Sequence, residues 1–268
     1  MRICFHCHCF PDALAPRAME VLTKNCAPAG IRPHTDGTAA GARAVLEAAG
    51  IDGAVICNIA TNTRQETKVN DFAISLRQQS DYFYALGSLH PDSEQMESEL
   101  DRLMAAGIRG LKLHPDYVGI LLSDPRFDRI FSLLEERGLF CVVHTGLDPI
   151  SPDLIHATPE MIANVIKKHP RLTFIAAHMG GLMRAAEVLE HLVGTGVYID
   201  TSLCSKRPDE RELLHRILRE HDSDRILFGT DTPWSTPRKE VAFVEEAPIS
   251  DAVREKIFSG NAKRLLGL

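Results

Sequence analysis

Short apolar, strand-like runs alternate with segments of helical periodicity along the whole chain, and this alternation restricts the fold more than any other feature. The strand-like runs lie at residues 3–5, 54–57, 83–89, 108–113, 139–143, 172–177, 197–199 and 225–229. Strands that are separated by helices of about 10–15 residues form parallel βαβ units. Eight such units in 268 residues predict an α/β fold, a closed (β/α)8 TIM barrel, in a single domain over residues 1–268.

Segments with apolar residues at helical spacing lie between these runs, at residues 38–49, around 72–76, and at 94–106, 127–137, 159–169, 182–193, 210–221 and 237–266. A doubly wound open sheet is the alternative arrangement of such units. That fold usually has a glycine-rich phosphate-binding turn after its first strand, whereas Phe10-Pro11-Asp12 follows the first strand here. The barrel is therefore favoured.

Residues 11–36 lack clear periodicity and contain Pro16, Pro28, Gly30 and Pro33 as helix breakers. A long irregular segment inside a compact domain usually has a function. We expect residues 11–36 to form a loop between the first strand and the first helix, over the mouth of the active site.

Composition excludes several classes of function. The net charge is −6 and no long basic run is present, so we expect no nucleic-acid partner. No apolar run approaches the ~18 residues of a membrane span, and the first apolar segment is too short for a signal peptide. The seven cysteines do not suggest a disulfide framework, and Cys4-x-x-Cys7 has no second pair to complete a zinc site. We expect a cytoplasmic protein.

Six of the twelve histidines, and two aspartates, follow strand-like runs directly: His6, His8, His90, His114, His144, His178, Asp200 and Asp231. In a (β/α)8 barrel, these strand ends meet at one mouth. Side chains alternate along a strand, so His6 and His8 lie on one face, about 7 Å apart. Cys4 would share that face as a small core residue. Nitrogen ligands with one carboxylate are typical of a catalytic divalent metal site.

The motifs at these strand ends resemble those of the amidohydrolase superfamily, in its amidohydrolase-related branch, which also holds aminocarboxymuconate semialdehyde decarboxylase-like enzymes. They occur in order as His6-x-His8, Gly110-Leu-Lys-Leu-His-Pro115, Val143-His-Thr-Gly146, Ala177-His-Met-Gly-Gly181, Phe228-Gly-Thr-Asp-Thr-Pro-Trp234 and the closing Gly260-Asn-Ala-Lys-Arg-Leu-Leu-Gly267. The sequence departs from the family at Cys4, where an aspartate is common, and in residues 11–36.

The resemblance implies that His6, His8, His144 and Asp231 bind one divalent metal ion, which we expect to be zinc. It also implies that His178 acts as an acid or base, or orients the transition state. Asp231 could accept a proton from a metal-activated water. We assign Lys112, His114 and Trp234 to substrate binding. The metal count depends on Lys112, because a carboxylated lysine on this strand would bridge two ions. Asp116 is close in sequence and favours a charged, unmodified Lys112, so we expect a single ion.

These features predict a metal-dependent hydrolase that acts on a small polar substrate, such as an amide, a lactone or a similar carbonyl compound. The alternative is a lyase, a decarboxylase or hydratase that uses the same metal site, with Arg17, Arg32 or Arg207 to hold a carboxylate. A metal-dependent phosphodiesterase or a non-catalytic barrel fits less well. We expect a small-molecule substrate as the partner, and the sequence leaves open whether the chain forms a homo-oligomer.

Overall fold

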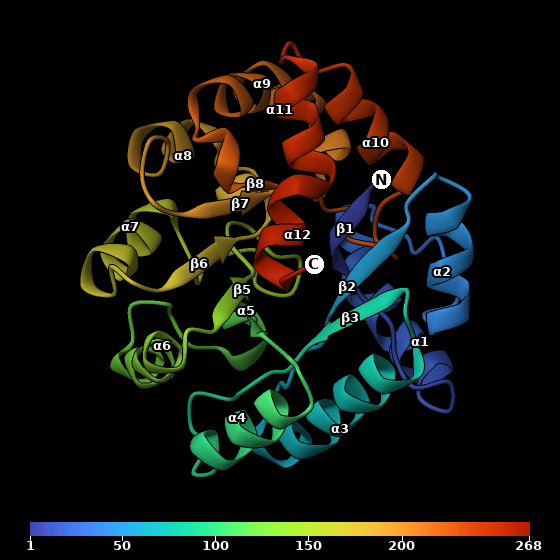
Figure 1. Ribbon diagram of the computed structural model, residues 1–268, viewed down its shortest axis with the longest axis vertical. Helices are drawn as coiled ribbons and strands as arrows, with labels where there is room; N and C mark the ends of the chain where they lie inside the picture. The colour runs from blue at the N-terminus through green and yellow to red at the C-terminus, as the bar shows by residue number, and fades with distance from the viewer.

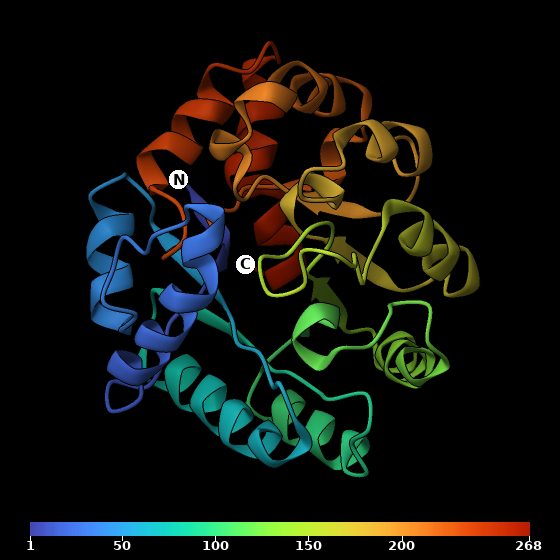
Figure 2. The same ribbon diagram turned by 180° about the vertical axis from the view of Figure 1, so that it is seen from behind.

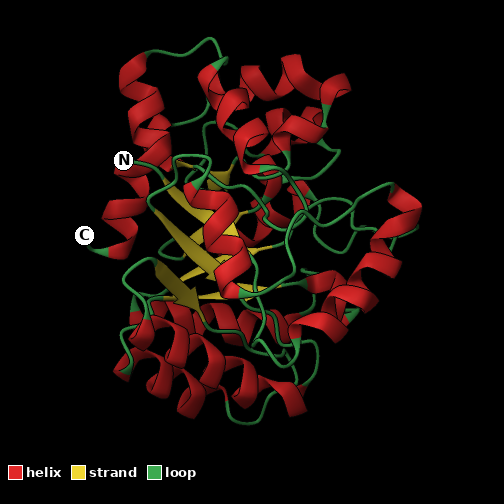
Figure 3. Cartoon of the chain, turned by 90° about the vertical axis from the view of Figure 1, so that its right-hand side faces the viewer, coloured by secondary structure: helices red, strands yellow, loops and turns green.

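The computed structural model describes residues 1–268, and eight parallel strands form its centre (Figures 1 and 3). The strands are β1 (Ile3–Cys7), β2 (Gly53–Cys57), β3 (Phe83–Leu86), β4 (Gly110–Leu113), β5 (Phe140–Val143), β6 (Thr173–Ala176), β7 (Tyr198–Asp200) and β8 (Ile226–Leu227). They pair in parallel in two groups, β1-β2-β3 and β4-β5-β6-β7-β8. The eight predicted strands are confirmed, with slightly different ends.

Backbone hydrogen bonds also cross the two gaps between these groups. Between β3 and β4, the Gly87 nitrogen donates to the Gly110 oxygen (3.1 Å) and the Lys112 nitrogen donates to the Gly87 oxygen (2.8 Å). Between β8 and β1, the Phe5 nitrogen donates to the Phe228 oxygen (2.6 Å). The strands therefore follow one another around a complete ring, and the fold is the predicted TIM barrel.

Most of the helices surround the ring of strands, whereas α12 lies across the centre of the ring in Figure 1. The helices are α1 (Ala15–Cys26), α2 (Ala39–Glu47), α3 (Thr63–Gln79), α4 (Met96–Ala105), α5 (Pro115–Val118), α6 (Pro125–Arg137), α7 (Pro159–Lys168), α8 (Ala185–His191), α9 (Arg211–Glu220), α10 (Pro237–Glu245), α11 (Asp251–Glu255) and α12 (Asn261–Leu266). The helical region predicted at 237–266 is present, but residues 246–250 interrupt it, and a π-helical segment (Lys256–Gly260) joins α11 to α12. Pro248 lies in a break after α10, and the Ser250 side chain caps the start of α11. No helix of the chain is both long enough and apolar enough to cross a membrane.

The segment 11–36 is not the irregular loop that the sequence predicted, because it contains the helix α1. Pro16 lies in the first turn of this helix, where a proline starts a helix rather than breaking one. The buried residues Ala15 and Met19 are four positions apart on one face. The His34 nitrogen donates to the Pro233 oxygen (2.8 Å), which joins the segment to the loop after β8. Figure 2 shows α1 on the side of the barrel opposite to α12.

Two apolar clusters divide the core. The smaller one fills the barrel and consists of Ile3, Phe5, Val55, Cys57, Leu86, Phe140, Val142, Ile175, Ala177 and Leu227, with Ala262 of α12 at its end. The larger one lies between strands and helices. Because α12 packs at the amino ends of the strands, the carboxyl ends on the opposite side are left for the polar residues.

A bulge in β1 changes the predicted positions of its side chains. Cys4 pairs with Ala54, but Cys7 pairs with Ile56, so β1 has one extra residue between these two points. Phe5 lies in the inner cluster and Cys4 in the outer one. The prediction that Cys4 shares the face of His6 is therefore wrong. Phe5 faces inward, so His6 would face outward in a regular strand. The extra residue of the bulge turns His6 inward instead.

Candidate active site

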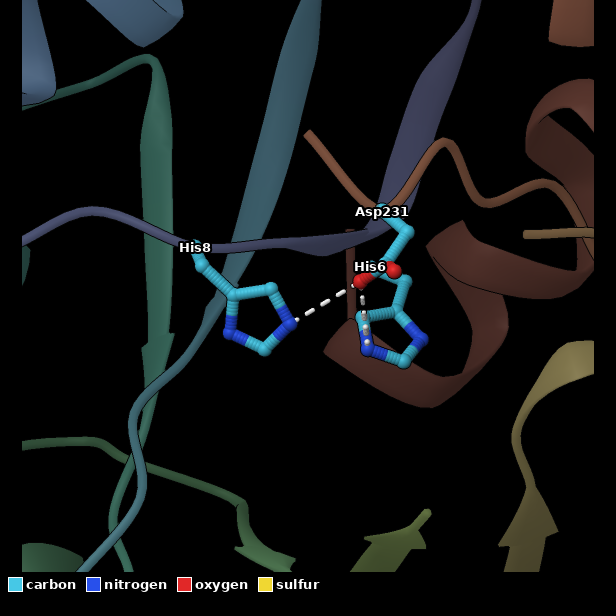
Figure 4. A group of neighbouring side chains, drawn as sticks. All are labelled: His6, His8 and Asp231. Carbon is cyan, nitrogen blue, oxygen red and sulfur yellow. Dashed lines mark hydrogen bonds and ion pairs between the residues drawn. The ribbon is translucent and has the colours of Figure 1, made fainter. Parts of the chain in front are cut away.

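Three of the predicted metal ligands meet where β1 and β8 end (Figure 4). The Nε2 atom of His8 lies 3.0 Å from Oδ1 of Asp231, and the Nε2 atom of His6 lies 3.4 Å from the same oxygen. His6 and Asp231 are buried, and His8 is largely buried. The donors of a tetrahedral ion with bonds of ~2.0–2.1 Å are about 3.3 Å apart, so these three atoms have the spacing of metal ligands.

The second nitrogen of each imidazole fixes its ring. Nδ1 of His8 lies 2.8 Å from the Cys57 carbonyl oxygen, and Nδ1 of His6 lies 2.9 Å from Oδ2 of Asp200. A carbonyl or carboxylate oxygen can only accept, so both Nδ1 atoms carry the proton. With the proton on Nδ1, the Nε2 lone pair of each ring points at a carboxylate oxygen. A cation between these acceptors would satisfy all of them, and the residues therefore fit a divalent ion.

The orientation of the two imidazole rings and the charge of Asp231 also fit a divalent ion. The rings of His6 and His8 are inclined by 63°, so their in-plane lone pairs are not confined to parallel planes, as those of stacked rings are. Burial lowers the pKa of His8, which favours its neutral form. Burial opposes ionisation of Asp231, but the adjacent imidazoles of His8, His6 and His178 outweigh burial and lower its pKa.

His178 lies beside this group and is held on both sides. Its ring stacks on His6 with centroids 5.0 Å apart, and its Nδ1 lies 2.8 Å from the Ser202 hydroxyl. Its Nε2 lies 3.0 Å from Nδ1 of His144. Burial lowers the pKa of His178 to about 3, so the ring is neutral near pH 7. Both His178 and Asp231 have φ of +56°, a conformation that is unfavourable for residues other than glycine and often occurs at functional sites.

The structure does not place His144 with the other three predicted ligands. Its Nε2 lies 3.4 Å from Oδ2 of Asp148 and has no hydrogen-bond partner. The ring stacks on His114 at 4.1 Å, with only 8° between the planes. His114, His144 and Asp148 offer donor atoms within 4.8 Å of one another, but the in-plane lone pairs of parallel rings do not converge, so this group matches one ion less well than His6, His8 and Asp231 do.

The sequence predicts a charged Lys112 because Asp116 is nearby in the chain, but the structure places Lys112 away from Asp116. Lys112 is fully buried, and its Nζ lies 3.1 Å from Nε2 of His6. The expected neighbour Asp116 instead contacts His156 and Ser151. Lys112 thus lies at the metal-binding group rather than beside an acidic rim residue, because Asp116 begins a helical turn that carries it away from the strand.

The remaining residues that the sequence indicated as site candidates differ in burial and in their hydrogen-bond partners. Trp234 is half-buried, and its backbone nitrogen donates to the Asp231 oxygen (2.7 Å). Arg17 and Arg32 are exposed. Arg207 is buried and donates to backbone oxygens, so it is not free to hold a substrate carboxylate. His90 accepts a hydrogen bond from the Asp92 nitrogen through its Nδ1 (3.1 Å).

Sequence reasoning missed Ser202 and Asp148. Ser202 follows Asp200 by two residues, so the alternation of side chains along a strand could have identified it. Asp148 lies in the loop after β5, where no periodic pattern predicts its position. Burial raises the pKa of Asp148 to about 6.

The family model described as amidohydrolase matches residues 6–268. A search of curated proteins found no match.

Solved structures resemble the whole chain at low sequence identity. An uncharacterised TIM-barrel protein from Bordetella bronchiseptica is 19% identical, with a TM-score of 0.76, and the match covers 99% of this chain and 98% of that one. A candidate 2-pyrone-4,6-dicarboxylic acid hydrolase from Pseudomonas putida is 18% identical (TM-score 0.69; 99% and 97% covered). A 5-carboxyvanillate decarboxylase from Novosphingobium aromaticivorans, with bound manganese, is also 18% identical (TM-score 0.70; 100% and 97% covered). These likenesses establish the fold.

Proposed function

The chain belongs to the amidohydrolase family and is an enzyme, and from this premise we propose that it hydrolyses a small polar carbonyl compound, such as an amide or a lactone, with one divalent metal ion. The observation that carries the proposal is the convergence of His6, His8 and Asp231. The Nε2 atoms of the two imidazoles and Oδ1 of Asp231 have the spacing of metal ligands, and hydrogen bonds through Nδ1 hold both imidazoles in the orientation that a metal needs.

We propose zinc as the ion, because two imidazoles and a carboxylate are ligands that zinc prefers. A bound ion would lower the pKa of a water molecule and polarise the substrate carbonyl. His144 would complete the ligand set if its ring turned away from Asp148, as the family resemblance implies.

The remaining residues have roles that follow from their positions. Asp231 is ionised and can take a proton from the attacking water and pass it to the leaving group. His178 is neutral and stacks on His6. If the His144 ring turned toward the metal, Nε2 of His178 would lose its present partner and could donate a hydrogen bond to the oxyanion that develops on the substrate. Lys112, His114 and Trp234 are proposed to contact the substrate. All seven cysteines are free thiols, which supports a cytoplasmic enzyme.

A panel of lactones, amides and unsaturated carboxylic acids, assayed with the metal-loaded protein, tests this proposal. Hydrolysis that is lost on chelation and restored by zinc is the expected result. Absence of turnover with every lactone and amide, together with CO₂ release from a carboxylic acid, would contradict it.

A decarboxylase that uses the same metal site is the second candidate, and the likeness to a manganese-containing decarboxylase favours it. A decarboxylase needs a cation near the substrate carboxylate, and Lys112 is the cation closest to the metal-binding group. Isotopically labelled water separates the two reactions, because a hydrolase adds one water oxygen to its product and a decarboxylase adds none.

A further inference from the structure

We propose that Arg207 is a positioning residue that holds His178 in its active orientation through the backbone. This inference rests on the proposed role of His178. It concerns a side chain in the connection between β7 and α9, which lies outside the group of proposed ligands and does not touch the His178 ring.

The turn that carries His178 has an unfavourable backbone conformation. His178 has φ of +56° and the next residue, Met179, has φ of +63°. This region is sterically unfavourable for any residue with a side chain, so two such residues in succession require support from the surrounding structure. The His178 nitrogen donates to Oδ1 of Asp200 (3.2 Å), but this bond supports only the start of the turn.

The guanidinium of Arg207 binds the turn at two points. One terminal nitrogen donates to the His178 oxygen and the other donates to the Gly181 oxygen, both at 3.0 Å. Arg207 is only 2% exposed, so these bonds are made away from water. A planar fork that bridges two carbonyls three residues apart fixes their separation, which a lysine ammonium cannot do.

Glu210 orients the guanidinium of Arg207 and connects it to the start of helix α8. Its Oε2 lies 2.6 Å from Nε of Arg207, and its Oε1 accepts a hydrogen bond from the Ala185 nitrogen at the start of α8 (2.9 Å). Arg207 and Glu210 therefore join the turn, α8 and the connection after β7 into one unit. The charge pair also offsets the cost of burying Arg207.

The orientation of the His178 ring depends on this turn. Its two nitrogens face Ser202 and His144 at 2.8 and 3.0 Å, so a small rotation of the backbone would break both contacts. A displacement of about 1 Å at a catalytic group can cost roughly 100-fold in rate. We therefore expect loss of Arg207 to impair turnover without removing any group that touches the substrate or the metal.

Arg207→Ala is the principal test, and guanidinium ion is the probe for rescue. A surface cavity of about 220 Å³, lined in part by Arg207, Arg211 and Phe243, gives the ion a path to the vacated position. We expect kcat to fall by 10- to 100-fold, with KM and metal content within twofold of wild type, and guanidinium to restore a substantial part of the loss. Arg207→Lys keeps the charge but not the fork and should restore little.

Arg211→Ala is the matched control. It lines the same cavity, but its guanidinium pairs with Glu246 at the surface. This variant should keep wild-type kcat and show no response to guanidinium. A normal kcat in Arg207→Ala, or a loss that guanidinium does not relieve in a folded protein, would overturn the proposal.

A readout without turnover separates this proposal from the proposed function. The imidazole resonance of His178 can be assigned by its absence in His178→Gln. We expect it to shift in Arg207→Ala, to return with guanidinium, and to stay unchanged in Arg211→Ala. An unshifted resonance would refute the positioning role even if no substrate were found. If Arg207→Ala fails to fold, Glu210→Gln provides the same test, with a smaller shift expected.

Discussion

The Nε2 atom of His8 lies 3.0 Å from Oδ1 of Asp231, although 223 positions separate the two residues in the sequence. The contact exists because the first and last strands of the barrel are neighbours, and the Asp231 nitrogen donates to the His6 oxygen (2.9 Å) at the same point. The proposed metal site thus lies at the junction where the barrel closes, so its geometry depends on the complete fold.

Loss of His8 should greatly weaken metal binding. His8→Ala removes one of three converging donors and leaves Asp231 without its nearest partner, so we expect metal affinity to fall at least ~100-fold. Elemental analysis after dialysis would measure this. His191→Ala, at the end of the outer helix α8, is the control and should retain wild-type metal content. Equal metal content in the two variants would contradict the assignment of His8.

Asp231→Asn should keep the fold and most of the metal but lose turnover by ~100-fold or more. A carboxamide oxygen can still face the ion, but it cannot accept a proton from water. Steady-state kinetics at matched metal content measures the effect. Asp153→Asn removes a charge from an exposed loop residue and should keep wild-type kcat. If Asp231→Asn retains more than about a tenth of the wild-type kcat, Asp231 is a ligand only.

The protein should bind one ion and carry an unmodified Lys112. The sequence argument depended on Asp116, which the structure places elsewhere. Nζ of Lys112 instead lies 3.1 Å from Nε2 of His6, where it can donate a hydrogen bond that a carboxylated side chain would lose. Intact mass spectrometry under native conditions should show one metal ion and no mass increment of CO₂. Lys112→Met should raise KM for an anionic or polar substrate while metal content is retained. A carboxylated lysine, or two ions, would contradict this prediction.

Glu240 should make stability depend on pH. This carboxyl group is fully buried and accepts hydrogen bonds from Ser205 and Ser235, and burial raises its pKa to about 7 from an ordinary value of 4.5. The folded state therefore binds the proton more tightly than the unfolded state does. The stabilisation is present below pH 4.5 and is lost as the pH rises toward 7, by at most about 1.4 kcal/mol per pH unit.

Glu240→Gln should remove that part of the pH dependence, which urea denaturation between pH 5 and 8 would measure as a flatter stability curve. Glu245→Gln changes a half-exposed carboxylate on the same helix and should keep the wild-type curve. Identical slopes for wild type and Glu240→Gln would show that Glu240 is already ionised when the protein is folded.

The barrel and the strand-end positions of the site residues could be predicted from the sequence, because hydrophobic periodicity reports which face of each strand or helix is buried. The orientation of single side chains could not be predicted from the sequence. His6 faces inward only because of a bulge in β1, and no residue pattern signals that bulge. The ring of His144 is turned by contacts with His178, His114 and Asp148, of which Asp148 lies in a loop. The sequence does not indicate the helix α1, because a proline such as Pro16 breaks a helix in its interior and is compatible with one only in the first turn.

Crystallisation of the zinc-loaded protein, with anomalous diffraction recorded at the zinc absorption edge, tests the central claim most directly. We predict a single strong peak within ~2.0–2.2 Å of Nε2 of His6, Nε2 of His8 and a carboxylate oxygen of Asp231. No peak at that position, or the only peak between His114, His144 and Asp148, would contradict the proposed active site.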